Sequence, residues 1–285
     1  MIFASIRAEW FKVSRRPSMW ITIGLLLAVS VSLEYVLVYI VATHPPKGVN
    51  LRLGGTLSSL RLDLYPAALV PKVLANMSGL YGIFALIAGV LVQGSEFGWG
   101  TVKTVYVQFP GRIAIAVGQL VTIALLVLIM ALGLFAVDAA TASVLATIDG
   151  QHITWPAALD VIKGVAAAWL ILYLMAMAGY GLATVFRQSA LAIGLGLGYV
   201  LVIENLVFGL LVNLGDTFQH IREWFPVANA QYLQQAFGVL RAAAAGGEGP
   251  AAPPVDGTHA LTVLCLWLAA IVIASVAVVK LRDVN

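Results

Sequence analysis

Residues 93–112, QGSEFGWGTVKTVYVQFPGR, decide how this chain is organised. The stretch separates two long apolar segments, so it forms a short loop at a membrane surface. An apolar stripe nevertheless runs through it at i, i+3, i+4 and i+7, formed by Val102, Val105, Tyr106 and Phe109. This spacing predicts a short amphipathic helix that Pro110 ends. Because so short a helix is marginal by itself in water, its apolar face predicts a partner surface.

The composition is that of a multi-pass membrane protein. Of the 285 residues, 61% are hydrophobic and only 10% are charged, whereas about a quarter are charged in a soluble domain. About 20 apolar residues are needed to cross a bilayer. Six windows meet that length, at 19–43, 73–92, 113–137, 161–186, 191–212 and 260–279. We therefore expect an all-α membrane protein in which residues 19–285 form one six-span domain, with no room for a separate soluble catalytic domain.

The basic residues orient these spans. An even number of spans puts both termini on one side, and we expect that side to be the cytosol. The inside segments 1–18, 93–112, 187–190 and 280–285 then hold nine Lys or Arg in 48 residues, against six in the 99 outside residues. This threefold difference in density follows the positive-inside rule. The pI of about 9.0 is thus explained by contact with anionic lipid, without a nucleic-acid partner.

Residues 1–18 predict a second amphipathic helix. Phe3, Ile6, Trp10 and Val13 fall on one side of a helical wheel, and the other side is charged, with Glu9, Lys12, Arg15 and Arg16. An apolar face with Trp opposite a basic face is typical of a helix that lies in the membrane interface.

The two amphipathic segments together resemble those of type-two ABC exporter permeases. In that family an elbow helix with an A-E-W-x-K motif precedes the first span, and here residues 8–12 read AEWFK. The loop between the second and third spans of the family carries a Glu, a Gly-Thr pair, a short coupling helix and a Pro-x-Arg ending. The matching residues here are Glu96, Gly100, Thr101, Pro110 and Arg112.

The resemblance implies partners and a contact site. The coupling helix of the family docks on a separate ATPase subunit, which binds ATP and Mg²⁺, and two permease copies assemble as a homodimer or heterodimer. The chain itself would carry no cofactor, and its location would be a bacterial plasma membrane. The expected ATPase-coupling residues are Glu96, Gly98, Gly100, Thr101, Val102, Val105, Tyr106, Phe109, Pro110 and Arg112.

Polar residues inside the predicted spans are the candidates for a transport cavity. Buried carboxylates are costly in a membrane and usually face a cavity or a partner. The candidates are Glu34, Asn76, Tyr199, Glu204 and Asn205. An alternative is that Glu34 or Glu204 is protonated and only bonds to a neighbouring helix. A strip of small residues, Ala190, Gly194 and Gly198, further predicts close helix packing in the fifth span.

The external segments offer no defined chemistry. The segment 44–72 begins with helix-breaking residues and then has a mildly amphipathic stretch. The segment 138–160 carries Asp138, Asp149, His152 and Asp160, whose spacing matches no metal motif, so we expect a solvated acidic loop. The segment 213–259 resembles the short helices that the permease family places before its sixth span.

Sequence motifs argue against an enzyme and leave the cargo open. The chain has no GxxxxGK[ST], HExxH or GxSxG motif. The resemblance therefore implies an ATP-driven exporter permease, and an apolar cavity would suit an apolar or amphipathic small molecule. Alternatives are a polysaccharide or lipid-carrier exporter, or a membrane scaffold or sensor coupled to an ATPase.

Overall fold

The computed structural model describes residues 2–44, 57–98, 112–211, 215–239 and 254–281, and the regular structure in these ranges is entirely helical. The expectation of an all-α protein is confirmed. Five helices are long and apolar enough to cross a membrane, namely Pro17–Thr43, Ile113–Ile148, Ala158–Phe186, Ser189–Leu211 and Gly257–Lys280. They correspond to the first, third, fourth, fifth and sixth predicted spans.

The chain begins with α1 (Ile2–Ser14), which is followed directly by the first long helix. That helix consists of α2 (Pro17–Val29), the π-helical η1 (Ser30–Val36) and α3 (Leu37–Thr43). Pro17 occupies its first turn, where a missing N–H costs nothing. In η1 the Leu37 N–H bonds to the Ser32 carbonyl, five residues back. The wider turn buries the adjacent side chains of Glu34 and Tyr35.

The second predicted span, 73–92, is not one continuous helix. Short helices α4 (Leu57–Leu62), η2 (Pro66–Ala68) and α5 (Leu69–Leu74) lead into turns at residues 75–79, and α6 then runs over Leu80–Gly98. Its described apolar part, Leu80–Glu96, is shorter than the five long helices. The six-span count therefore stays a prediction.

The third predicted span is longer than its apolar window indicated. Helix α8 covers Arg112–Ile148, so it continues past Asp138, where the predicted span ended. The expectation that Asp138 belongs to a solvated loop is wrong, since its side chain is fully buried. The apolar sequence after Asp138 extends the helix by almost three turns.

The remaining helices follow the predicted order. Helix α9 (Ala158–Phe186) ends at Arg187, which has a left-handed backbone with φ 54°. Next come α10 (Ser189–Leu197), the π-helical η3 (Gly198–Val207) and α11 (Phe208–Leu211). Two short helices, α12 (Asp216–Arg222) and α13 (Pro226–Ala236), precede α14 (Gly257–Leu281). The expected short helices before the sixth span are therefore present.

Helix α9 is the centre of the packing. It contacts α6, α8, α10 and α14 and is the most buried of the five long helices. Two glycines allow a close approach to α6. A Cβ on Gly89 would lie 1.8 Å from the Ala176 carbonyl oxygen, and one on Gly179 would lie 2.1 Å from the Leu86 carbonyl oxygen. Without side chains at these positions, the two backbones pack directly.

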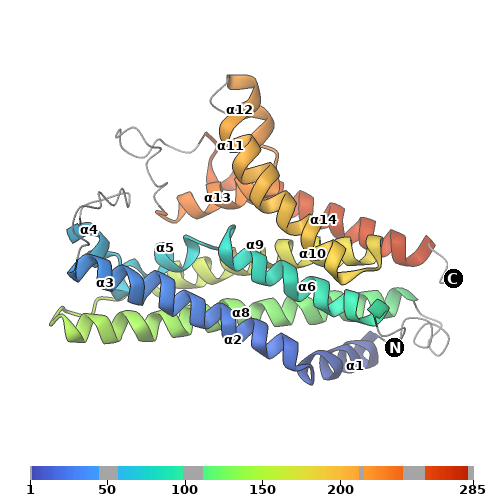
Figure 1. Cartoon of the computed structure of the whole chain (residues 1–285), viewed down its shortest axis with the longest axis horizontal. Helices are drawn as coiled ribbons and strands as arrows, with labels where there is room; N and C mark the ends of the chain where they lie inside the picture. The colour runs from blue at the N-terminus through green and yellow to red at the C-terminus, as the bar shows by residue number, and fades with distance from the viewer. Residues whose placement is uncertain (1, 45–56, 99–111, 212–214, 240–253, 282–285) are drawn as a thin grey trace.

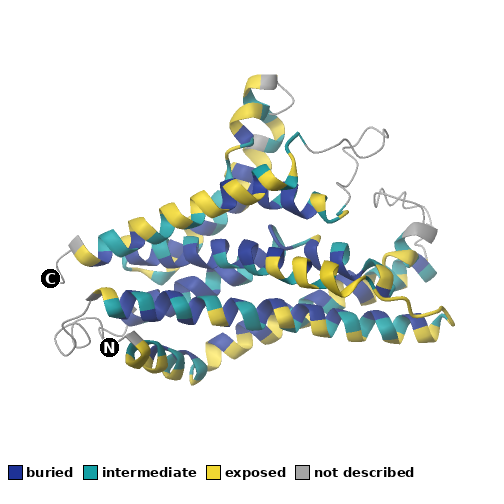
Figure 2. Ribbon diagram, turned by 180° about the vertical axis from the view of Figure 1, so that it is seen from behind, coloured by how far each residue is buried: buried dark blue, intermediate teal, exposed yellow. Residues whose placement is uncertain are grey.

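The arrangement is a bundle with one helix turned away from it. Helices α2–α3, α6, α8 and α9 run along the long axis, and α1 and the C-terminal end of α14 lie at the same end (Figure 1). The segment from α10 to α11 leaves the bundle, and its residues in η3 and α11 are largely exposed (Figure 2). The predicted strip is on this helix, but Gly194 and Gly198 have no atom within 4 Å of an added Cβ. Its predicted close packing is thus absent within the described part of the chain.

Candidate functional site

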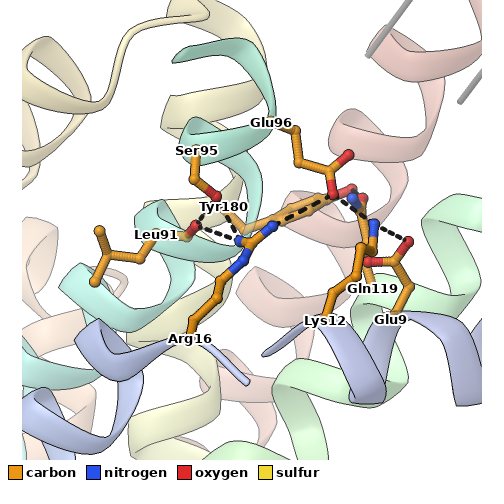
Figure 3. A network of polar contacts seen from close by, with 8 residues as sticks. All are labelled: Glu9, Lys12, Arg16, Leu91, Ser95, Glu96, Gln119 and Tyr180. Carbon is orange, nitrogen blue, oxygen red and sulfur yellow. Dashed lines mark hydrogen bonds and ion pairs between the residues drawn. The ribbon is translucent and has the colours of Figure 1, made fainter. Parts of the chain in front are cut away.

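A network of charged side chains joins α1 to the end of α6 (Figure 3). The Lys12 ammonium lies 2.7 Å from the Glu9 carboxylate on its own helix and 2.6 Å from Glu96 Oε1 on α6. Arg16, which follows α1, lies 3.8 Å from the same Glu96 oxygen. Its guanidinium also donates to the Leu91 carbonyl and to the Ser95 hydroxyl. The charges of two cations and two carboxylates thus cancel within the network.

The network is largely withdrawn from solvent. Glu9 and Glu96 are only 4% and 5% exposed, whereas the Lys12 side chain is 32% exposed. Burial raises the pKa of the Glu9 carboxyl, although its hydrogen bond and ion pair with Lys12 act in the opposite direction. Burial lowers the pKa of Lys12, but the charge of Glu96 and the bonds to both carboxylates outweigh it and raise this pKa above its usual value. The ion pair therefore keeps Lys12 charged.

This arrangement corrects the predicted faces of the first amphipathic helix. We expected Glu9 on the charged side of the helix and Phe3 on the apolar side that lies in the membrane interface. Glu9 is instead buried, whereas Phe3 is 89% exposed and its contact with the membrane interface stays a prediction. The reason is that α1 packs along α8, where a Cβ on Gly118 would lie 2.6 Å from the Ser5 hydroxyl, and this contact turns Glu9 and Lys12 towards α6.

A second hydrogen bond ties two more helices into the same end of the bundle. The Tyr180 hydroxyl of α9 donates to Gln119 Oε1 of α8 at 2.8 Å, and both side chains are buried. Figure 3 shows this pair beside the Lys12 and Glu96 side chains. Helices α1, α6, α8 and α9 are thus connected where α6 enters the predicted coupling segment. Sequence reasoning missed Gln119 and Tyr180, because neither belongs to a charged or motif-like stretch.

The predicted coupling residues are only partly described. Glu96 and Gly98 belong to the last turns of α6, and Arg112 begins α8. The other predicted residues lie outside the described residues, namely Gly100, Thr101, Val102, Val105, Tyr106, Phe109 and Pro110. The Glu96 carboxylate is bound by Lys12 and Arg16, and its predicted part in coupling to an ATPase remains a prediction.

The predicted cavity residues form two separate groups. In the first, the Asn76 amide donates a hydrogen bond to Glu34 Oε1, which joins the turns before α6 to η1. Asp138, which sequence reasoning assigned to a loop, belongs near this group, because it accepts a 2.6 Å hydrogen bond from Ser30 of η1. The apolar run on both sides of Asp138 was the signal for a buried position.

In the second group, Glu204 binds the start of an external helix. Its Oε2 accepts hydrogen bonds from the backbone N–H groups of Val227 and Ala228, at 2.9 and 3.1 Å. These donors belong to the first turn of α13, where N–H groups have no partner within the helix. Asn205 accepts a 3.0 Å bond from Gln231 in the same helix. The long helix Ser189–Leu211 therefore holds α13 through two adjacent polar residues.

A largely apolar pocket lies beside this contact. Its volume is about 390 Å³, and its wall combines α6, α9, η3, α13 and α14, with Leu86, Met175, Tyr199, Val227, Trp267 and Ile271 among the lining residues. Tyr199 is the predicted cavity residue that lines it, whereas Glu204 and Asn205 are not part of its wall. Such a volume fits a small apolar molecule or part of a larger one.

The geometry provides no metal centre in the residues that the structure describes, where no three His, Cys, Asp or Glu side chains gather. In comparisons with known proteins, no family model matches this sequence, and no curated protein matches it. These comparisons therefore assign no family to the chain, and its resemblance to the type-two ABC exporter permeases rests on the residues quoted above.

Proposed function

We propose that this chain is the transmembrane permease subunit of an ATP-driven exporter of the type-two ABC class. The observation that carries the proposal is the ion-pair network between α1 and the end of α6. Lys12 and Arg16 hold Glu96 three residues before the segment 99–111, which has the amphipathic pattern of a coupling helix. A force applied to that segment would pass directly to α1 and α6.

The connections within the bundle support such transmission. Helix α6 packs backbone to backbone on α9 at Gly89 and Gly179, so the two helices would move as one body. Helix α9 in turn forms part of the wall of the 390 Å³ pocket, together with η3 and α14. Movement at the cytosolic loop would thus reach the pocket through closely packed helices.

The pocket supports an apolar or amphipathic small molecule as cargo. Its lining surface is almost wholly apolar, with Tyr199 and Ser275 among the residues that line it. Export would require ATP, and the sequence carries no P-loop, so hydrolysis is assigned to a partner ATPase with Mg²⁺. A second permease copy would complete the transporter in a plasma membrane, with both termini in the cytoplasm.

The decisive experiment is purification of the tagged chain from its native membranes, followed by ATPase and transport assays in proteoliposomes. We expect an ABC ATPase to copurify in a two-to-two complex and to drive ATP-dependent export. The double variant Tyr106→Ser/Phe109→Ser should abolish both association and transport, because burial of an aromatic side chain contributes about 1.5–3 kcal/mol. Gln108→Ser, a change in the same segment but off the apolar stripe, is the matched control.

Two outcomes would contradict the proposal. One is a chain that purifies without any ATPase and transports without ATP. The other is unchanged association and transport in the Tyr106→Ser/Phe109→Ser variant. A copurifying ATPase whose activity never moves a substrate would instead favour the scaffold or sensor alternative.

A further inference from the structure

Two buried carboxylates lie inside the bundle, apart from the pocket and from the α1–α6 network. Glu34 belongs to η1 and Asp138 to α8, and they are 6% and 0% exposed. The Asn76 amide donates to Glu34 Oε1, and the Ser30 hydroxyl donates to Asp138 Oδ1 at 2.6 Å. The two carboxylates also interact electrostatically with each other. They therefore form one cluster, contributed by three segments that are distant in sequence.

The cluster lies among the long apolar helices, at the level of the centre of the first one. The first long helix runs from Pro17 to Thr43, and Ser30 is its central residue, with 13 residues in α2 before it. Asp138 is hydrogen-bonded to Ser30 and therefore lies at the same depth. A carboxylate at the centre of a bilayer is expensive to keep charged, and such residues usually belong to functional sites.

Several polar atoms of the cluster have unused hydrogen-bonding capacity. Asp138 Oδ2 and the Tyr35 hydroxyl have no hydrogen-bond partner among the described residues, and Glu34 Oε2 has none of good geometry. The Tyr81 hydroxyl interacts with Glu34 and Ser30 through long hydrogen bonds. These two tyrosines are 1% and 0% exposed, and both interact electrostatically with both carboxylates. Buried polar groups are normally satisfied, so the incompletely paired oxygens of the two carboxylates indicate an exchangeable occupant.

The charges and hydrogen-bond donors of the cluster indicate what kind of ligand it binds. Lys72 is the basic side chain that interacts with both carboxylates, and its ammonium lies 5.7 Å from the centre of the Tyr35 ring. Two ionised acids and one ammonium leave a net charge of −1, which one proton would neutralise. A metal ion would need several oxygen lone pairs. Asn76 and Ser30 instead turn hydrogen-bond donors towards the carboxylates.

We propose that Glu34 and Asp138 form an intramembrane binding site for one exchangeable proton, held on Glu34 Oε2 or Asp138 Oδ2. The proton comes from water and returns to it, and no covalent bond other than O–H forms or breaks. When it leaves, two like charges face each other across η1 and α8, and their repulsion weakens this contact. Proton occupancy is thereby linked to the packing of the first long helix against α8. The site does not rest on the proposed export function.

Infrared spectroscopy of the purified chain in lipid nanodiscs tests the proposal. The C=O stretch of a protonated carboxylic acid is followed over about pH 5 to 9, the range in which buried carboxyl groups are known to titrate. All spectra are recorded in a Glu204→Gln background, because Glu204 is another buried carboxylate. Glu9 and Glu96 are buried as well, so only the band that differs between the unsubstituted cluster and the double variant described below is assigned to the cluster. We expect a band that shifts in D₂O, disappears at high pH, and is absent from the Glu34→Gln/Asp138→Asn double variant.

The two single variants provide a second test, which can still be carried out if the double variant does not fold. With one acid left beside Lys72, the cluster is already neutral, so Glu34→Gln and Asp138→Asn should each lose the whole band at neutral pH. A half-sized band in each single variant would show two independent protonated acids and would overturn the one-proton site. A band that is absent from the unsubstituted cluster, or unchanged in every variant, would overturn it too. Loss of the band on adding NaCl at constant pH would identify a sodium site and refute the proton.

Discussion

Gly89 of α6 faces Ala176 of α9 so closely that an added Cβ would lie 1.8 Å from the Ala176 carbonyl oxygen. The obstacle is backbone and cannot rotate away, so any larger residue must push the two helices apart. The same holds for Gly179 on the opposite side of the contact, whose Cβ would meet the Leu86 carbonyl oxygen at 2.1 Å. The most extensive helix pair in the protein thus depends on two glycines.

We therefore expect Gly89→Ala to lower the free energy of unfolding by about 1–3 kcal/mol, the usual cost of overpacking a closely packed site. Gly194→Ala is the matched control, because an added Cβ there meets no atom within 4 Å. Thermal unfolding in detergent measures both. Equal melting temperatures for the two variants would show that α6 and α9 are not in backbone contact.

The ion-pair network predicts a defined effect of removing its shared cation. Lys12→Met keeps the apolar stem but leaves Glu9 and Glu96 with less positive charge nearby. A hydrogen bond to a charged group contributes about 1.5–3 kcal/mol to stability. Because Lys12 is partly exposed, we expect Lys12→Met to lower the free energy of unfolding by an amount near the lower end of this range.

Unfolding in mixed detergent micelles measures the loss, with Arg15→Met as the control. Arg15 is exposed and stacks on the neighbouring Phe11 ring 5.2 Å away. It takes no part in the contact with α6 in the described structure. If Arg15→Met destabilised the protein as much as Lys12→Met, the network would have no special role.

A third prediction concerns pH at the opposite end of the bundle. Asp149 accepts hydrogen bonds from Tyr39, Arg61 and Tyr65, at 3.1, 3.1 and 2.8 Å, which connect α3, α4 and the segment before η2 to the end of α8. Burial raises the pKa of Asp149, but these three bonds and the charge of Arg61 outweigh it, so the pKa lies below its ordinary value.

Because the folded pKa of Asp149 is below the unfolded one, the folded state binds fewer protons. The resulting stabilisation is complete above the unfolded pKa of about 3.9 and is lost as the pH falls through the folded value. Asp149→Asn should therefore destabilise the protein at pH 7, and the difference should shrink steadily as the pH falls below about 3.9. Melting temperatures measured at pH 7 and over a series of acidic pH values test this, with the exposed Asp160 changed to Asn as control. A difference that does not shrink with falling pH would contradict the ionic origin of the contact.

Hydropathy was sufficient to predict the helical class and most of the spans, because apolar length is a local property of the sequence. It failed at Asp138, where the predicted span ended at the first acidic residue. The cost of that buried carboxylate is reduced by Ser30, which is 108 residues away in the sequence. It also failed at residues 75–79, where Asn76 bonds to Glu34 instead of continuing a helix.

The candidate site could be predicted only in part, for a related reason. Periodicity identified an amphipathic helix at residues 1–18, but it placed Glu9 with the solvated charged side chains, because a helical wheel contains no information about Glu96 on α6. Likewise, Glu204 was identified as a buried acid, but its bonds to Val227 and Ala228 depend on how a later helix folds back. Tertiary contacts between distant segments decided each of these positions.

The last prediction concerns the contact between Glu204 and the start of α13. The Glu204 carboxylate accepts two backbone N–H groups at the start of α13, and a residue that caps a helix in this way contributes about 0.5–2 kcal/mol. Glu204→Ala should remove both bonds and speed hydrogen exchange at the Val227 and Ala228 amides by up to about 30-fold, the upper end of that range. Glu204→Gln retains one acceptor oxygen and should give a smaller increase.

Hydrogen–deuterium exchange with mass spectrometry measures the rate at these two amides, with Asn205→Ala as the matched control. Asn205 is the next residue and also contacts α13, but through Gln231, in the second turn of that helix. Its removal should leave the first turn of α13 unchanged. If Asn205→Ala accelerated exchange at Val227 and Ala228 as much as Glu204→Ala, general loosening of α13 would explain the effect, and the capping role of Glu204 would be wrong.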